Sequence, residues 1–485
     1  MAETTAAPDR SKDRFPRQTW FIIGNEAAER FSYYGMRNIL TVFLITTLLN
    51  DVPEADRSAI ARSNFHIFAM GVYLFPLLGG YLADRYFGKY RTILWLSLLY
   101  CVGHLFLAVF EGNKTGFYSG LFLIALGAGG IKPCVSAFVG DQFTEKNKHL
   151  TKKIFGVFYW SINFGSLFAS LCIPFVLQYA GPRWAFGVPG ALMLLATFIF
   201  WLGRNHYAEV PPTGADPHSF LKVVFTALRE KKQSAGHWLD RALVEHPSSD
   251  VEGAKSVFRV LAIFAMIPIF WALFDQKASL WVVQGMTMQA PMLPLVDRPM
   301  AASQMQALNP AMVMILIPLT QLVIYPLFDR LGWPLTPLRR IAFGMYIAGA
   351  SYILVAFIQL ALDGGNQLSL LWQTAPYLVL TLSEVLVSTT GLEFAYSQAP
   401  QKMKGTIMSF WNLTVFGGNL LVAVIARLNV FEGATTYFFY AGLILVAGVA
   451  FWLISRNYKT VDYFQKAEPK PVVAPSEHQL SAPSS

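Results

Sequence analysis

The sequence predicts an all-α integral membrane protein in which twelve transmembrane helices form two six-helix bundles. Of its 485 residues, 54% are hydrophobic and 14% are charged, whereas ordinary soluble domains carry about 25% charged residues. Apolar runs long enough to cross about 30 Å of hydrocarbon occur in two sets of six, separated by a polar stretch. An Asp-Arg motif at Asp84 also returns at Asp329, about half the chain later, as in transporters built from repeated bundles.

The first bundle is predicted to span residues 18–206, after a polar cytoplasmic tail at 1–17. The apolar run that follows the tail contains charged residues and has no small-residue cleavage site near its end. We therefore expect an uncleaved first helix and not a signal peptide. The six apolar runs of this half lie at about 18–48, 60–85, 90–111, 118–141, 153–179 and 184–206.

A polar cytoplasmic linker at 207–256 is predicted to join the bundles. Within it, residues 219–246 carry apolar side chains at about helical spacing but no run of about eighteen, so we expect an amphipathic surface helix and no extra span. The second bundle is predicted at 257–456. Its six apolar runs lie at about 257–289, 305–329, 337–362, 373–399, 403–427 and 434–456. The tail at 457–485 is rich in Pro, Ser, Ala and Lys, and we expect it to be cytoplasmic and mostly disordered.

Basic residues are distributed unevenly between the two sides, which predicts that both termini are cytoplasmic. With that orientation, the inner loops hold Arg85, Lys89, Arg91, Lys146, Lys148, Lys152, Lys153, Arg330, Arg339, Arg340, Lys402 and Lys404. The outer loops and helix ends hold Arg57, Arg62, Lys114, Arg183, Arg298 and Arg427. The formal charge of +9 therefore indicates orientation in the lipid bilayer. It does not indicate nucleic-acid binding, which would need basic residues clustered on one soluble face.

The sequence contains no pattern typical of a metal site or an enzyme. Cys101, Cys134 and Cys172 lie within apolar spans and lack the spacing of a disulfide framework or of metal ligands. We also find no nucleophile paired with a base. The expectation is a protein without a metal, a cofactor or catalytic residues.

One stretch stands out, because NEAAERFSYYGMRN at 25–38 places charges inside an apolar span. At about 100° per residue, spacings of three and four put these side chains on one helical face. Charge at membrane depth costs about 3 kcal/mol or more per residue unless it faces water or partners. Mutual neutralisation between helices is the alternative reading, but small residues join helices more easily. The face is therefore predicted to line a substrate path, and its residues are Glu26, Glu29, Arg30, Tyr33, Tyr34 and Arg37.

The charged residues deep in the spans balance one another, as buried charge requires. The acids are Glu26, Glu29, Asp275 and Glu384, and the bases are Arg30, Arg37, Lys132 and Lys277. Arg37 and Asp275 come from opposite halves at similar outer depth, so a salt bridge between them could close the outer face. Lys132 and Glu384 could close the inner face in the same way. Lys277 lies about 200° around the helix from Asp275, so we expect it to snorkel toward water.

Several motifs resemble those of known transporters. GGYLADRYFGKYR at 79–91 resembles the loop between helices 2 and 3 of the major facilitator superfamily. EAAERFSYYG at 26–35 matches the ExxERFxYYG signature of the proton-coupled oligopeptide transporter family within that superfamily. Further stretches resemble this family in order, namely GAGGIKP at 127–133, FYWSINFGSL at 158–167, FWALFDQ at 270–276, NP at 309–310 and SEVLVSTTGLEFAYSQAP at 383–400. By these motifs the chain is identified as a member, similar to bacterial di- and tripeptide permeases.

The resemblance implies a symporter that carries di- and tripeptides with protons by alternating access across the inner or plasma membrane, without a cofactor. It implies a peptide site lined by Tyr33, Tyr34, Arg37, Tyr73, Lys132, Asn163, Trp271, Asn309, Glu384 and Trp411. It implies proton coupling through Glu26, Glu29, Arg30, Asp275 and His66. His66 is similar to the helix 2 histidine of animal members, and a core role for it is the alternative. Lys277 departs from the family, in which that position is normally uncharged.

The two termini of a free peptide explain why such a site needs charges of both signs. Glu384 from one half could bind the ammonium, and Arg37 or Lys132 from the other could bind the carboxylate, while aromatic residues offer broad contact surface. Two alternatives share the fold. A carrier of nitrate or another small anion is one, although Glu384 would repel an anion. A non-transporting peptide sensor is the other, and it carries the same signature.

Overall fold

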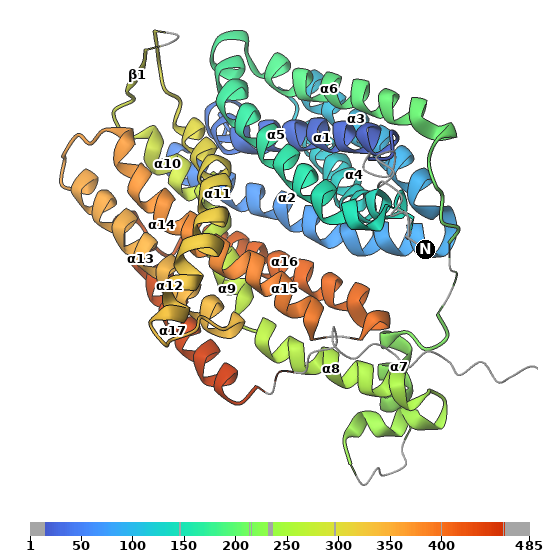
Figure 1. Ribbon diagram of the computed structural model, residues 1–485. Helices are drawn as coiled ribbons and strands as arrows, with labels where there is room; N and C mark the ends of the chain where they lie inside the picture. The colour runs from blue at the N-terminus through green and yellow to red at the C-terminus, as the bar shows by residue number, and fades with distance from the viewer. Residues whose placement is uncertain are drawn as a thin grey trace, which may run out of the picture.

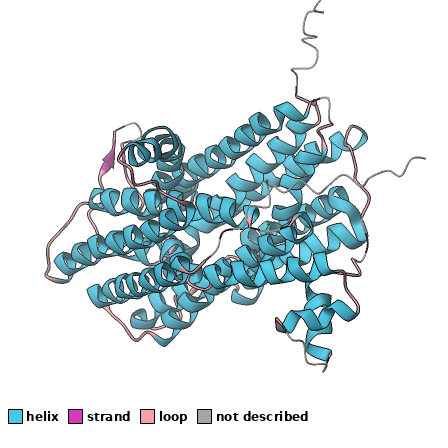
Figure 2. Ribbon diagram, turned by 60° about the horizontal axis from the view of Figure 1, so that its bottom comes forward, coloured by secondary structure: helices cyan, strands magenta, loops and turns pink. Residues whose placement is uncertain are grey.

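The computed structural model describes residues 15–144, 147–212, 214, 216–230, 236–294, 297–398, 400–458 and 460. Helices dominate this part of the chain, and its strands β1 (Met292–Leu293) and β2 (Arg298–Pro299) form a short antiparallel ribbon. Two helical bundles lie side by side, the first blue to green and the second yellow-green to red in Figure 1. Figure 2 shows the helices of both in cyan. Most of both predicted tails falls outside the described residues.

The first bundle contains six long helices. They are α1 (Thr19–Phe43), α2 (Glu54–Leu82), α3 (Gly88–Val109), α4 (Lys114–Asp141), α5 (Thr151–Ala180) and α6 (Pro182–Leu202). Their apolar faces share one core. Glycines bring α2 and α4 into backbone contact, since a Cβ at Gly79 would lie 2.3 Å from the Cα of Gly130. The glycines of the GAGGIKP motif thus let α4 pack tightly against α2. This packing fixes the position of Lys132, which follows Gly130 by two residues.

The second bundle has more broken helices. Its elements are α8 (Ser248–Phe264), α9 (Ile267–Asp275), α10 (Leu280–Met286), α11 (Leu308–Leu319), α12 (Tyr325–Arg330), α13 (Pro337–Asp363), α14 (Thr374–Glu384), α15 (Thr390–Ser397), α16 (Lys404–Leu428) and α17 (Gly433–Arg456). A break before α9, near Pro268, bends the span formed by α8, α9 and α10 by 50°. Single π-turns join α11 to α12 and α14 to α15, and each pair forms one continuous span.

The twelve predicted spans are all present. Nine helical stretches of the described chain are long and apolar enough to cross a bilayer, and the bent span makes ten. One stretch of 56 residues, Glu54–Val109, holds two helices, α2 and α3, joined by a π-turn at Ala83–Phe87. The remaining span is α1, a helix of 25 residues that is long enough to cross a bilayer but carries four charged residues. The all-α, two-bundle fold is therefore confirmed.

The linker departs from its predicted form. The sequence predicted one helix over 219–246. In the structure, α7 (Phe220–Arg229) is followed by Glu230 in an extended conformation, and a 3₁₀ segment lies at Trp238–Val244. The buried face of α7 packs on the core of the second bundle through Phe220, Val223 and Ala227. After Ala227, Leu228 is exposed, and the following sequence REKKQSAG provides no further large apolar residue for that face. A short helix depends on such packing, so α7 ends there.

The two bundles meet along α2 and α16, and along α5 and α11. We call the end of the bundles at which α1 ends and α2 begins the outer end, following the orientation that the basic residues predict; α7 lies at the opposite, inner end (Figure 1). Gly418 of α16 lies against the α9 backbone, because a Cβ there would be 2.5 Å from the carbonyl oxygen of Pro268. This contact positions the next residue, Asn419, beside Asp275.

Candidate transport site

A buried charge cluster lies on the inner half of α1. Arg30 Nε is 3.1 Å from Glu26 Oε1, and its guanidinium also pairs with the carboxylate of Glu29. All three side chains are buried. Lys132 of α4 lies within electrostatic reach of both acids. Two acids and two bases therefore form a neutral set, as burial requires.

Tyrosines surround this cluster on its outer side. The rings of Tyr33 and Tyr34 pack edge to face with centroids 5.3 Å apart. The Nζ of Lys132 lies 4.2 Å from the ring centroid of Tyr73, which belongs to α2. An ammonium over an aromatic face is a favourable contact that leaves its hydrogens available to other acceptors. Lys132 is thus held at the interface between cluster and tyrosines.

A salt bridge joins the two bundles nearer the outer end. Arg37 Nη2 of α1 lies 2.7 Å from Asp275 Oδ1 at the end of α9. Arg37 is 5% exposed and Asp275 3%, so water does not screen the pair. The second carboxylate oxygen of Asp275 accepts a hydrogen bond from Asn419 Nδ2 at 2.8 Å. This is the pair that the sequence predicts as an outer gate.

His66 of α2 extends this network to a fourth helix. Asn419 Nδ2 donates to Asp275 and to the carbonyl of Val415, so its Oδ1 faces His66 Nδ1 at 2.7 Å. A carbonyl oxygen only accepts, so His66 Nδ1 carries the hydrogen. When His66 is neutral, its Nε2 accepts from Ser279 Oγ at 2.8 Å. A proton on Nε2 would reverse this last bond and make His66 a donor to the hydroxyl.

Contacts between the bundles gather at the outer end. Besides the Arg37 and His66 network, the cross-bundle hydrogen bonds found between described residues are Thr41 Oγ1 to Ala278 O, Ser63 Oγ to Ala423 O, Gln306 Nε2 to Asn38 O and Gln304 Nε2 to Leu171 O. All of them lie in the outer half. The structure therefore represents a state closed at its outer end.

The inner pair predicted from the sequence is not formed in this state. Lys132 contacts Tyr73, whereas Glu384 Oε2 accepts from Asn309 Nδ2 at 2.6 Å. A gate at the inner end is needed only when the outer end is open. The Lys132 and Glu384 pair stays a prediction for that other state.

The expectation that Lys277 snorkels toward water is wrong. It does not snorkel, because its side chain is 5% exposed and its Nζ donates to Asn309 Oδ1 at 3.1 Å. Asn309 thereby bridges Lys277 and Glu384. The prediction was wrong because α9 stops at Asp275 and a 3₁₀ turn follows, so residues no longer advance by about 100° each. The carbonyl of Lys277 that this break frees accepts from Tyr377.

A small cavity lies between the gate and the bridged lysine. It measures about 60 Å³, which is room for a few water molecules. Its walls include Tyr34, Arg37, Tyr73, Lys277, Asn309 and Glu384. In this state, closed at its outer end, the space between charges of both signs has room for one charged group of a ligand.

The remaining predicted residues lie further toward the inner end. Trp271 of α9 and Trp411 of α16 pack nearly perpendicular, with ring centroids 6.1 Å apart. Asn163 of α5 donates to the carbonyl of Tyr159 in its own helix at 2.9 Å. Glu384 and Tyr159 interact electrostatically across the bundles. The predicted set therefore extends over both bundles.

Two residues of the network were missing from the sequence prediction, Asn419 and Ser279. Both are neutral polar residues in apolar spans, and such residues are common where they only join helices. Asn419 could have been predicted from the sequence, because an asparagine side chain in an apolar span must find hydrogen-bond partners. No group of three or more His, Cys, Asp or Glu in the described chain could hold a metal ion.

Comparison with known proteins identifies the family. The model of the POT family matches residues 90–440. The crystal structure of an auto-inhibited POT family peptide transporter is 47% identical, with a TM-score of 0.87 over 93% of this chain and 99% of that one. The in meso crystal structure of the POT family transporter PepTSo is also 47% identical, with a TM-score of 0.86 over 92% and 99% of the two chains.

Animal relatives match over about three quarters of this chain. Peptide transporter 3 of Caenorhabditis elegans is 36% identical over 370 residues, which cover 72% of this chain and 51% of the relative. Solute carrier family 15 member 2 of Homo sapiens is 37% identical over 378 residues, 74% of this chain and 51% of the relative. The chain thus spans about half the length of these relatives. With its signature residues, its fold and these matches in agreement, the chain belongs to the POT family.

Proposed function

We propose that this protein carries di- and tripeptides together with protons across the inner or plasma membrane by alternating access. The observation that supports this most is the division of charge between the bundles. Arg37 of the first bundle and Glu384 of the second both line the small cavity, and Lys132 of the first bundle lies against Tyr73, which lines it too. A zwitterionic peptide would place its carboxylate toward the first bundle and its ammonium toward the second.

Proton coupling follows from the charge balance of the inner cluster. Glu26 and Glu29 face Arg30 and Lys132, and the set is neutral. When one acid takes a proton, the set gains one positive charge, which a peptide carboxylate can balance. Proton and peptide then favour each other's binding, and by linkage the effect is reciprocal. The proton gradient, and no cofactor, would supply the driving force.

The gate connects this chemistry to movement. Arg37 and Asp275 hold the outer end closed, and opening requires that their 2.7 Å pair separates. A peptide carboxylate that competes for Arg37, or a proton on Asp275, would each weaken the pair. In the state open to the outside, Lys132 and Glu384 would close the inner end instead. The names of the relatives, which are peptide transporters, support the same substrate class.

Transport into proteoliposomes tests the proposal. A labelled dipeptide should accumulate when the outside is made acidic relative to the lumen, and a protonophore should abolish the accumulation. Absence of uptake, with binding of the peptide retained, would favour the peptide-sensor alternative. Competition by nitrate but not by dipeptide would favour the anion carrier.

A further inference from the structure

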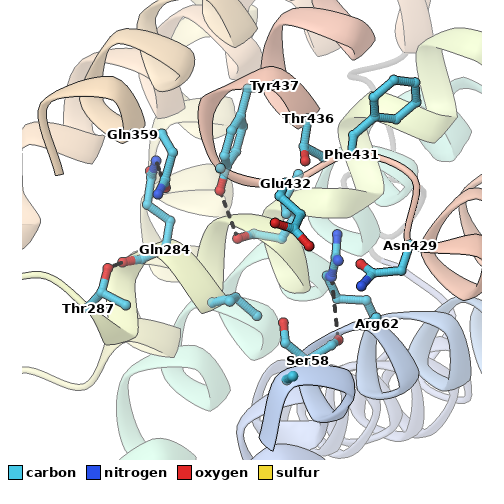
Figure 3. Close-up of a pocket in the computed structure, with 15 residues that line it drawn as sticks. Ser58, Arg62, Gln284, Thr287, Gln359, Asn429, Phe431, Glu432, Thr436 and Tyr437 are labelled. Carbon is cyan, nitrogen blue, oxygen red and sulfur yellow. Dashed lines mark hydrogen bonds between the residues drawn. The ribbon is translucent and has the colours of Figure 1, made fainter. Parts of the chain in front are cut away.

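A second hollow opens at the outer end, beyond the gate. It has a volume of about 230 Å³ and lies between the start of α2 and the outer ends of α10, α13 and α17 (Figure 3). Ser58 and Arg62 form the wall from the first bundle, and Gln284, Glu432 and Tyr437 face them from the second. Because its walls belong to both bundles, the hollow exists only while the two outer ends are together.

Arg62 lines this hollow without a counter-charge. Its Nε donates to the carbonyl oxygen of Ser58 at 3.4 Å, and within the described chain no carboxylate oxygen approaches its guanidinium to 4.0 Å. A half-buried cation without a partner is an unfavourable arrangement. A guanidinium also offers two parallel donors that match a carboxylate. Arg62 is therefore suited to hold the carboxylate of a ligand.

Glu432 supplies the opposite charge from the segment before α17. It is exposed, faces the hollow beside Asn429, and has no cationic nitrogen within 4.0 Å in the part of the chain that the structure describes. Phe431 and Tyr437 border the same space, and aromatic faces attract cations. A ligand with an anion alone would meet repulsion from Glu432. The wall thus fits a molecule that carries both an ammonium and a carboxylate.

The polar floor between these charges is rigid. Gln284 Nε2 donates to Gln359 Oε1 at 3.0 Å, and Gln359 Nε2 donates to Asp363 Oδ1 at 2.8 Å. The other oxygen of Asp363 accepts from the backbone of Ala434 at the start of α17. This chain of bonds ties α10, α13 and α17 together and holds the hollow in one shape.

We propose that this hollow is a second, weak binding site for zwitterionic peptides, and that a peptide bound there inhibits transport from outside. The inference rests on the proposed peptide transport and adds a regulatory site to it. The volume of about 230 Å³ is below the about 300 Å³ at which sites for drug-sized ligands begin, so we expect a small ligand such as a dipeptide, bound weakly. The site differs from the central cavity, which lies on the other side of the gate.

Inhibition of transport follows because the walls of the hollow come from both bundles. A peptide that joins Arg62 in the first bundle to Glu432 in the second binds only the state with the outer end closed. A ligand that binds one of two states shifts the population toward it. At a ligand concentration equal to the dissociation constant, the closed state gains about twofold. The return to the outward-open state slows accordingly, and transport declines at high external peptide.

Initial uptake rates test this in proteoliposomes under a fixed pH gradient, with dialanine raised from below to far above its KM. The wild-type rate should pass through a maximum and fall at least twofold. Arg62→Gln and Glu432→Gln should each give simple saturation with an unchanged KM. Arg57→Gln is the matched control, since Arg57 lies on the same helix, α2, and donates to the carbonyls of Asn50 and Val52 outside the hollow. Simple saturation in the wild type, or a decline that persists in both variants, would overturn the proposal.

A second measurement does not depend on transport. Spin labels at Gly112 and Leu371, exposed residues at the outer ends of the two bundles, report the distance between those ends. High dialanine should shift the wild type toward the short distance, and should do so less in Arg62→Gln. N-acetylated dialanine lacks the ammonium and should have no effect in either. If no dipeptide is taken up at all, the proposed function fails, whereas equal distance shifts in wild type and Arg62→Gln would refute only the outer site.

Discussion

The substitution Asp275→Asn should loosen the outer gate, and the structure gives its magnitude. The change removes the charge from a pair with 2.7 Å between its atoms, in which Arg37 and Asp275 are 5% and 3% exposed. A hydrogen bond between charged groups contributes about 1.5–3 kcal/mol. At about 1.4 kcal/mol per factor of ten, the ratio of closed to open molecules should fall about tenfold to a hundredfold. The new amide also places an NH₂ group where Asp275 Oδ2 or Oδ1 accepted, so one of the two bonds is lost whichever way it turns.

Distances between spin labels at Gly112 and Leu371 measure this ratio directly in a background without the native cysteines. Asp275→Asn should move most of the population to the longer distance and should also flatten the dependence of uptake on pH. Adding Arg37→Gln should change little further, because the two residues act as one pair. Asp141→Asn is the control, since its 2.6 Å pair with Lys89 lies within the first bundle. An unchanged distance distribution and pH profile in Asp275→Asn would show that Asp275 neither gates nor couples.

Three further predictions concern the cluster, the bridged lysine and the histidine network. Glu29→Gln should abolish proton-driven uptake but spare counterflow of labelled for unlabelled dipeptide, which needs no net proton movement; proton-driven uptake at the wild-type rate would make the cluster structural. Lys277→Gln removes a cation that competes with the peptide ammonium for Glu384. The KM for dipeptides should therefore fall several-fold, which corresponds to ~1 kcal/mol of binding free energy; a rise in KM would contradict this. Asn419→Leu should leave His66 and Asp275 without their shared amide and lengthen the spin-label distance, and Asn419→Asp should lengthen it as well, because a carboxylate cannot donate to Asp275; a wild-type distance distribution in either variant would refute the bridging role.

The sequence was most informative about the charges. Residues such as Glu29 and Arg37 in an apolar span must be paired or face a polar interior, and that single constraint places α1 at the centre of the fold. It also indicated partners from opposite halves, because Arg37 and Asp275 lie at similar depth in the two sets of spans. Tight glycine contacts such as that between Gly79 and Gly130 belong to a motif that was recognised, although its packing role is visible only in three dimensions.

Other features could not be derived in this way. The position of Lys277 depends on a helix break after Asp275, and periodicity assumes an unbroken helix. Asn419 joins His66 to Asp275 only because Gly418 lets α16 approach α9, which is a tertiary contact between distant segments. The extent of α7 likewise depended on where its packing surface ends. Uncharged polar residues and helix breaks leave weak patterns, whereas buried charges leave strong ones.

Simultaneous recording of proton and peptide entry tests the central claim most directly. Proteoliposomes that contain wild-type protein and a pH-sensitive dye in the lumen would receive external dialanine without any imposed gradient. Coupled symport predicts that the lumen acidifies as labelled dialanine enters, and that N-acetylated dialanine amide causes neither effect. Entry of dialanine without acidification, or acidification that does not depend on the peptide, would contradict the account.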